Sequence, residues 1–202
     1  LLGFGVSKPI HVVPNGIHLE TYRNAPRGLL RARLGLNGDH RLALFVGRLG
    51  AEKNPEFLLQ AFARVAAQLP NTRLVIAGDG YARPALQTLA QELGLAERVL
   101  FLGNVPFAEM PRLYADADVM VSASTSEAHP MALIEGLAAG LPFVAVRDEA
   151  FQSGVEDGAN GFLTGLERDA FAARLIELLG DDAQRQTMGE ASRQKSLHFS
   201  LQ

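Results

Sequence analysis

The chain has 202 residues, of which 48% are hydrophobic and 20% are charged, and its mean hydropathy is +0.07. This length and composition fit a globular protein with a sizeable core. The net charge of -3, with lysine and arginine spread along the chain, argues against a nucleic-acid-binding protein. The absence of cysteine excludes disulfides, thiolate metal sites and cysteine nucleophiles, and it fits a reducing compartment such as the cytoplasm.

Short apolar runs alternate with stretches of helical periodicity along the whole chain. Strands are predicted at residues 10–13, 41–46, 73–77, 99–102, 119–122, 143–146 and 161–163. Helices are predicted at residues 26–34, 55–68, 82–93, 108–115, 131–139, 168–179 and 182–195. Pro26 and Pro55 suit a first helical turn, and Gly94 and Gly140 suit helix ends. The alternation predicts one doubly wound, mostly parallel, Rossmann-like α/β domain over residues 1–202.

No segment is typical of a signal peptide, and no apolar run reaches the roughly 18 residues of a membrane-spanning helix. The longest apolar stretch, from Met131 to Val146, is interrupted by Glu135 and Pro142. Because the sequence starts with Leu1 rather than a methionine, we expect a fragment of a longer protein.

The densest basic segment contains Arg23, Arg27, Arg31 and Arg33, which we interpret as a solvated helix face rather than a phosphate or lipid contact. Two acidic side chains, Asp116 and Asp118, are interpreted as marking a turn between a helix and a strand.

Four loops follow predicted strands, at residues 47–54, 78–80, 103–106 and 123–130. Ligands of doubly wound sheets bind beyond the carboxyl ends of the strands, so we expect these loops to lie together around a ligand. They bring glycines, cations, a carboxylate and several hydroxyls to one edge of the sheet. Arg48 and Lys53 flank a loop that leads into a helix, where two cations and free amides suit a diphosphate; an ordinary charged surface loop is the alternative.

Glu127 lies in the last of these loops, and Glu135 lies in the helix that follows it. Burying Glu135 in this apolar helix requires hydrogen-bond partners, which ligand hydroxyls could supply; alternatively Glu135 caps the helix or faces solvent. The start of the same helix offers the amides of Met131 and Ala132 to a phosphate, whereas Pro130 has no amide hydrogen to donate.

The remaining signals are weaker. His129 follows Glu127 closely and is a candidate substrate contact, and Asp79 is either a ligand contact or part of a Gly-Asp-Gly turn that begins at Gly78. The sequence contains no phosphate-loop signature, no three-glycine dinucleotide fingerprint and no cluster of histidines and carboxylates typical of a metal site. We therefore expect no metal and no cofactor.

Six segments, taken together and in this order, resemble the C-terminal domain of glycosyltransferase family 4 enzymes, which have the two-domain GT-B architecture. They are Val12-Val13-Pro14-Asn15-Gly16-Ile17, Phe45-Val46-Gly47-Arg48-Leu49 through Glu52-Lys53-Asn54, Leu74-Val75-Ile76-Ala77-Gly78-Asp79-Gly80, Val99-Leu100-Phe101-Leu102-Gly103, Ser126-Glu127 through Ile134-Glu135-Gly136-Leu137-Ala138-Ala139-Gly140-Leu141-Pro142, and Asp157-Gly158-Ala159-Asn160-Gly161-Phe162-Leu163. The resemblance covers nearly the whole chain.

The resemblance implies a role for each matching residue. Arg48 and Lys53 would hold the donor diphosphate, in place of a metal ion, with Gly47 allowing close approach of the backbone. Glu127 would contact the donor sugar near the reacting carbon, and Glu135 would bind the ribose. The loop with Asn104 and Val105 would face the base.

One departure lies after the first glutamate, where many family members have Gly-Phe-Gly and this chain has Ala128-His129-Pro130. The segment from Ser122 to Glu127 is similar to a subgroup that glucosylates diacylglycerol. The implied reaction is retaining transfer of a sugar, with UDP-glucose or a related UDP-sugar as the expected donor, to a hydroxyl of an unknown lipid or glycan acceptor. An N-terminal domain would bind the acceptor, so we expect this fragment alone to bind the donor without turnover. We expect a cytoplasmic protein, peripheral at the inner membrane face when complete.

Three alternatives remain open at this stage. The first is another enzyme of the same fold, such as a nucleotide-sugar epimerase or a phosphorylase, which an assay of transfer against epimerisation would separate. The second is a non-catalytic nucleotide-binding module, in which substitution of Arg48 or Glu127 would leave cellular glycoside levels unchanged. The third is an NAD-dependent domain, which a titration with NADH would identify; the missing glycine fingerprint counts against it.

Overall fold

Six strands form one sheet in the computed structural model, which describes residues 15–127 and 130–201. The strands are β1 (Arg41–Val46), β2 (Thr72–Ala77), β3 (Val99–Gly103), β4 (Val119–Ser122), β5 (Phe143–Val146) and β6 (Gly161–Thr164). Neighbouring strands pair in parallel throughout, in the order β3-β2-β1-β4-β5-β6. This order is that of a doubly wound Rossmann sheet and confirms the predicted fold class.

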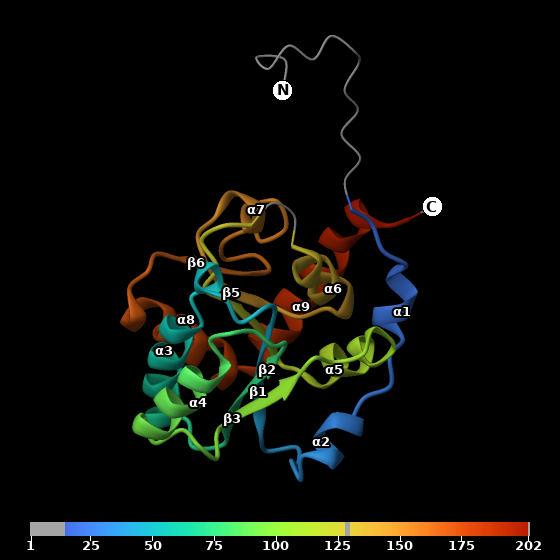
Figure 1. The fold of residues 1–202 in the computed structure, drawn as a ribbon. Helices are drawn as coiled ribbons and strands as arrows, with labels where there is room; N and C mark the ends of the chain where they lie inside the picture. Colours follow the sequence, from blue (N-terminus) through green and yellow to red (C-terminus); the bar gives the residue numbers. More distant parts are fainter. Residues whose placement is uncertain (1–14, 128–129, 202) are drawn as a thin grey trace.

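Helices cover both faces of this sheet (Figure 1). The α-helices are α1 (Leu19–Arg23), α2 (Leu29–Arg33), α3 (Pro55–Gln68), α4 (Arg83–Glu92), α5 (Met110–Asp116), α6 (Met131–Ala139), α7 (Glu149–Gln152), α8 (Arg168–Gly180) and α9 (Asp182–Ser196). Short 3₁₀ turns are η2 (Ala51–Lys53), η3 (Phe107–Glu109) and η4 (Leu197–Phe199). Helices α3, α4 and α8 lie on one side of the sheet, and α1, α5 and α6 lie on the other.

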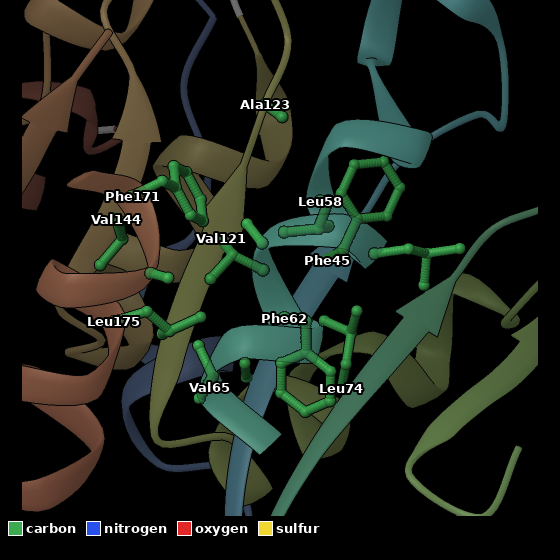
Figure 2. Close-up of a cluster of buried hydrophobic side chains, with 14 of the residues drawn as sticks. Phe45, Leu58, Phe62, Val65, Leu74, Val121, Ala123, Val144, Phe171 and Leu175 are labelled. Atoms are coloured by element: carbon green, nitrogen blue, oxygen red, sulfur yellow. The ribbon is translucent and has the colours of Figure 1, made fainter. Parts of the chain in front are cut away.

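Two apolar clusters, one on each face, form the core. Successive residues of a strand point to opposite faces. In β1, Ala43 and Phe45 therefore join the cluster under α3 and α8, while Leu42 and Leu44 join the cluster under α1, α5 and α6. Figure 2 shows the first cluster, in which Phe62 of α3 is fully buried. Burial on both faces explains why the strands read as near-continuous apolar runs.

Most predicted elements are confirmed, with β1, β4, β5, α3 and α6 at their predicted bounds. Pro55 occupies the first turn of α3, and Gly94 and Gly140 have positive φ at helix ends, as expected. The short helices α1 and α7 were not predicted, because five and four residues are too few to show periodicity. The predicted strand at residues 10–13 lies outside the described residues.

The helix predicted at residues 26–34 is wrong at its start, since α2 begins only at Leu29. Gly28 precedes it in the left-handed region, with φ 92°, so Pro26 lies outside the helix. The carboxylate of Asp116 caps this helix from another element, accepting hydrogen bonds from the amides of Gly28 and Leu30. The helix predicted at residues 108–115 likewise starts later, as the α5 helix from Met110, after a 3₁₀ turn.

Two residues of the basic segment, Arg23 and Arg31, are not part of a solvated helix face, which corrects the sequence interpretation for them, whereas Arg27 and Arg33 are exposed. The guanidinium of Arg31 is mostly buried and donates to Asp118 Oδ2 at 2.7 Å and to the carbonyl of Asp116 at 3.0 Å. Arg23 donates to the carbonyl of Arg193 at 3.0 Å. Asp116 and Asp118 do lie at the turn between α5 and β4, and they also anchor α2 to it. Arg23 and Arg31 therefore have structural roles.

The strand order creates a crevice between β1 and β4. The chain proceeds from β1 toward β2 on one side and continues through β4 on the other, so the loops after these two neighbouring strands diverge. Such a switch point is where open α/β sheets bind ligands. In the described part of the chain, no helix combines the length and apolarity needed to cross a membrane.

Candidate functional site

A cavity of about 550 Å³ opens at this switch point, a size within the range of small-molecule sites. Its lining includes Gly47, Arg48, Lys53, Glu127, Pro130, Met131, Ala132 and Glu135. A second hollow of about 520 Å³ shares Gly47 and Arg48 with the first and adds Gly78, Asp79, Asn104 and Val105. The structure thus brings together every predicted site residue that it describes. The remaining one, His129, lies outside the described residues.

Lys53 and Glu127 form an ion pair across the crevice. The Lys53 Nζ donates to Glu127 Oε1, and the two side chains are only 18% and 13% exposed. Lys53 ends the turn after β1, while Glu127 comes from the loop after β4, so the pair joins the two sides of the switch point. An anion entering here would meet a cation that is already held in place by a carboxylate.

Arg48 extends from the same turn with its side chain 74% exposed. Its Nη2 and Nε donate to Glu52 Oε1 at 2.6 and 3.2 Å. This hydrogen bond, with the attraction between the charges, raises the pKa of Arg48 and lowers that of Glu52. The Glu52 carbonyl also accepts from Ser124 Oγ at 3.2 Å and from the amide of Thr125 at 3.3 Å, which ties the β1 loop to the β4 loop.

The amino end of α6 lines the same cavity. Met131 and Ala132 belong to the first turn, where backbone N–H groups have no carbonyl to bind within the helix. The helix dipole adds partial positive charge there. Pro130, at the N-cap, contributes its carbonyl to the amide of Leu133 at 3.1 Å. Together with Lys53, this turn makes one part of the cavity suited to a phosphate.

Glu135 is 7% exposed and lines the cavity, so the alternative that it caps the helix or faces solvent is wrong. Its Oε2 accepts a hydrogen bond from the Tyr114 hydroxyl at 2.7 Å. Burial raises the pKa of Glu135, and the tyrosine hydrogen bond opposes this rise. Sequence reasoning missed Tyr114 because it lies on α5, a different helix, and no local spacing links the two residues.

Gly78 and Asp79 have structural roles in the second hollow. Gly78 has φ 138°, and a Cβ there would lie 1.9 Å from the Gly47 carbonyl oxygen, so only glycine lets the two loops pass. Asp79 accepts from the amide of Gly80 at 2.8 Å and from Arg83 Nη1 at 2.8 Å, and these bonds lower its pKa. The turn interpretation of Asp79 therefore accounts for its contacts.

Asn104 and Val105 follow β3 and form the far wall of the second hollow. The loop that carries them is fixed to β2 by a hydrogen bond from the Gly78 amide to the Gly103 carbonyl at 2.8 Å. Among residues 15–127 and 130–201, no group of three histidine or carboxylate side chains is arranged to hold a metal ion.

The site therefore consists of two connected parts. One part combines the cations Arg48 and Lys53 with helix amides, and it lies beside the carboxylates of Glu127 and Glu135. The other part is lined by residues that include Gly78, Asp79, Asn104 and Val105 of the loops after β2 and β3. This arrangement can hold an anionic centre that has hydroxyl-bearing groups on either side.

A family model described as glycosyl transferases group 1 matches residues 27–195. The chain belongs to this family. Among its relatives, the D-inositol 3-phosphate glycosyltransferase of Mycolicibacterium gilvum is 38% identical over 95% of this chain and 43% of the relative. The alpha-monoglucosyldiacylglycerol synthase of Acholeplasma laidlawii is 35% identical over 74% of this chain and 39% of the relative. The chain thus spans about two fifths of the length of these group 1 relatives.

A solved structure of a similar fold is the Anabaena protein Alr3699/HepE in complex with UDP-glucose. It is 26% identical, with a TM-score of 0.78 over 92% of this chain and 52% of that protein. This likeness agrees with the fold implied by the resemblance to a GT-B domain.

Proposed function

We propose that this chain is the donor-binding half of a retaining glycosyltransferase that transfers a sugar from a UDP-sugar, with UDP-glucose as the first candidate, to an acceptor hydroxyl. The observation that carries the proposal is the convergence of Arg48, Lys53, Glu127 and Glu135 on one crevice at the switch point. Membership of the glycosyltransferase family and the UDP-glucose complex of a structural relative support it.

The diphosphate of the donor fits the cationic part of the site. Arg48, Lys53 and the first amides of α6 would neutralise the charge that develops when the bond between the anomeric carbon and the diphosphate oxygen breaks. The electron pair of that bond leaves with the diphosphate. The acceptor oxygen bonds to the anomeric carbon on the face that the diphosphate leaves, and the acceptor's hydroxyl proton passes to the departing diphosphate oxygen. Because side chains and helix amides already supply positive charge, we propose that no metal ion is required.

The two carboxylates would flank this centre. Glu127 would accept hydrogen bonds from the sugar, and its pairing with Lys53 would also orient that lysine toward the diphosphate. Glu135 would accept from the ribose, as a buried carboxylate needs partners. The base would lie in the second hollow against the loop of Asn104 and Val105.

Another domain would complete the enzyme. The group 1 relatives are more than twice as long as the matched region, and we propose that an N-terminal domain supplies the acceptor site and the remaining catalytic groups. On this proposal the 202-residue chain binds the donor but does not turn it over. The acceptor is a lipid or a glycan, and a cytoplasmic location remains a prediction.

A calorimetric titration of the chain with UDP, UDP-glucose, GDP, ADP and NADH tests this function, together with an assay of sugar transfer by the chain alone. We expect UDP and UDP-glucose to bind, GDP and ADP to bind more weakly, and Arg48→Ala to weaken the uridine nucleotides. A matched control is Arg174→Ala, which changes an equally cationic but remote side chain on α8. Preference for NADH, no binding of any nucleotide, or sugar transfer by the chain alone would each contradict the proposal.

A further inference from the structure

Three helices bring a buried polar cluster together behind the cavity. Tyr22 comes from α1, Tyr114 from α5 and Glu135 from α6, and all three side chains are buried within an otherwise apolar part of the core. The two tyrosine rings pack edge to face, with centroids 5.7 Å apart and an interplanar angle of 69°. Burying polar groups costs free energy, so we expect a role for this cluster at the cavity.

The hydrogen bond from Tyr114 determines how Glu135 meets the cavity. The Tyr114 hydroxyl, itself fully buried, donates to Oε2 at 2.7 Å, and Glu135 also lines the cavity. A carboxylate has two acceptor oxygens in one plane, so a fixed partner on Oε2 restricts where Oε1 can point. The bond also favours the ionised form of Glu135, although burial has the larger effect and raises the pKa of this carboxyl.

Tyr22 differs from its neighbour in one respect. Its hydroxyl is buried and meets the geometry of a hydrogen bond with none of the described residues. Burial, and after it the nearby charge of Glu135, raises the pKa of Tyr22. The two tyrosines therefore offer a matched pair. Both are buried in the same cluster, but among the described residues only the Tyr114 hydroxyl is at hydrogen-bond distance and angle from the carboxylate.

We propose that Tyr114 is a positioning residue that holds Oε2 of Glu135 so that Oε1 accepts from the ribose hydroxyls, which makes the site selective for ribonucleotides over nucleotides that lack these hydroxyls. This inference rests on the proposed function, since it assumes that a uridine nucleotide occupies the crevice. Tyr114 itself does not touch the ligand. Its effect passes through Glu135 alone.

The test compares UDP with 2′,3′-dideoxy-UDP in calorimetric titrations of the purified chain. Hydrogen bonds to a charged group make the unmodified chain prefer UDP by about tenfold to a hundredfold. Tyr114→Phe removes only the hydroxyl. We expect it to weaken the affinity for UDP by about tenfold and to leave the affinity for dideoxy-UDP unchanged. A merely structural role would weaken both nucleotides alike, so the ratio of the two affinities separates positioning from damage.

Tyr22→Phe is the matched control, and we expect it to leave the ratio as it is in the unmodified chain. Glu135→Gln should reduce the ratio at least as far as Tyr114→Phe does. If Tyr114→Phe does not fold, the same titrations are made with the double variant that also has Tyr22→Phe. The second change removes a buried hydroxyl without a hydrogen-bond partner in the described residues, which should restore stability.

The inference is overturned if Tyr114→Phe retains the full preference for UDP or loses affinity for both nucleotides equally. These outcomes leave the proposed function standing, because UDP still binds the unmodified chain. If the unmodified chain binds neither nucleotide, the proposed function fails and this inference fails with it.

Discussion

The two faces of the sheet are built differently. Every buried residue of α3, α4 and α8 is apolar, and these helices cover one face. On the other face, α1, α5 and α6 each bury at least one polar side chain, namely Tyr22, Tyr114 and Glu135. Only the second face reaches the cavity with a buried charged group. The first face therefore serves as scaffold. On the second face, burying polar side chains costs stability but provides part of the cavity lining.

The largest expected effect comes from removing a large side chain from the scaffold face. Phe62 is fully buried in the cluster of Figure 2, and Phe62→Ala should lower the free energy of unfolding by about 3–5 kcal/mol. Urea denaturation measures this change, and Phe107→Ala, at a phenylalanine that is 75% exposed, is the control with little expected effect. A similar loss in both variants would break the distinction between scaffold and surface.

In the cavity, Lys53→Ala should weaken the affinity for UDP by about tenfold to a hundredfold, because it removes a charged hydrogen-bond donor from the proposed diphosphate position. Calorimetry measures the dissociation constant. Lys195→Ala, on α9 and away from the cavity lining, should leave it unchanged. Equal affinity in Lys53→Ala and the unmodified chain would remove this lysine from the site.

A pH series sharpens the contrast between the faces through Glu135. Burial raises its pKa, so the folded chain keeps this proton to a higher pH than the unfolded chain does. The associated stability is present below the ordinary carboxyl pKa and is lost as pH rises through the folded-state pKa.

Glu135→Gln cannot ionise, so we expect it to lose less stability than the unmodified chain as the pH rises above the ordinary carboxyl pKa. Thermal melts across this range measure the difference, and the exposed Glu92→Gln on α4 is the control. Parallel melting curves for Glu135→Gln and the unmodified chain would show that burial of the charge carries no cost.

The smallest expected effect concerns Glu52, which competes for Arg48 at the rim of the site. The pair is largely exposed, so its strength is limited by solvent screening. Glu52→Gln should free Arg48 for the diphosphate and tighten UDP binding about twofold, because exposed ion pairs contribute little. Calorimetry compares the dissociation constants for UDP. The control is Glu190→Gln, which removes a similar exposed ion pair, with Arg193, on α9. Weaker binding would mean that Glu52 supports the site.

The sequence alone determined the strands, most helices and the edge of the sheet where the site lies. Parallel strands buried on both faces must read as apolar runs, and the carboxyl ends of parallel strands must share one edge. For that reason the positions of Arg48, Lys53 and Glu127 in loops after β1 and β4 could be predicted from local pattern, before any contact was known.

Only the tertiary structure decided which side chains meet. Glu135 binds Tyr114 across 21 positions, Lys53 binds Glu127 across 74, and Arg31 binds Asp118 across 87. The packing of the helices against the sheet determines these partners. Because the partners are far apart in the chain, no periodic pattern in the sequence reveals them. The same reason explains the error over the basic segment, where composition suggested a solvated face and packing made Arg31 a buried anchor.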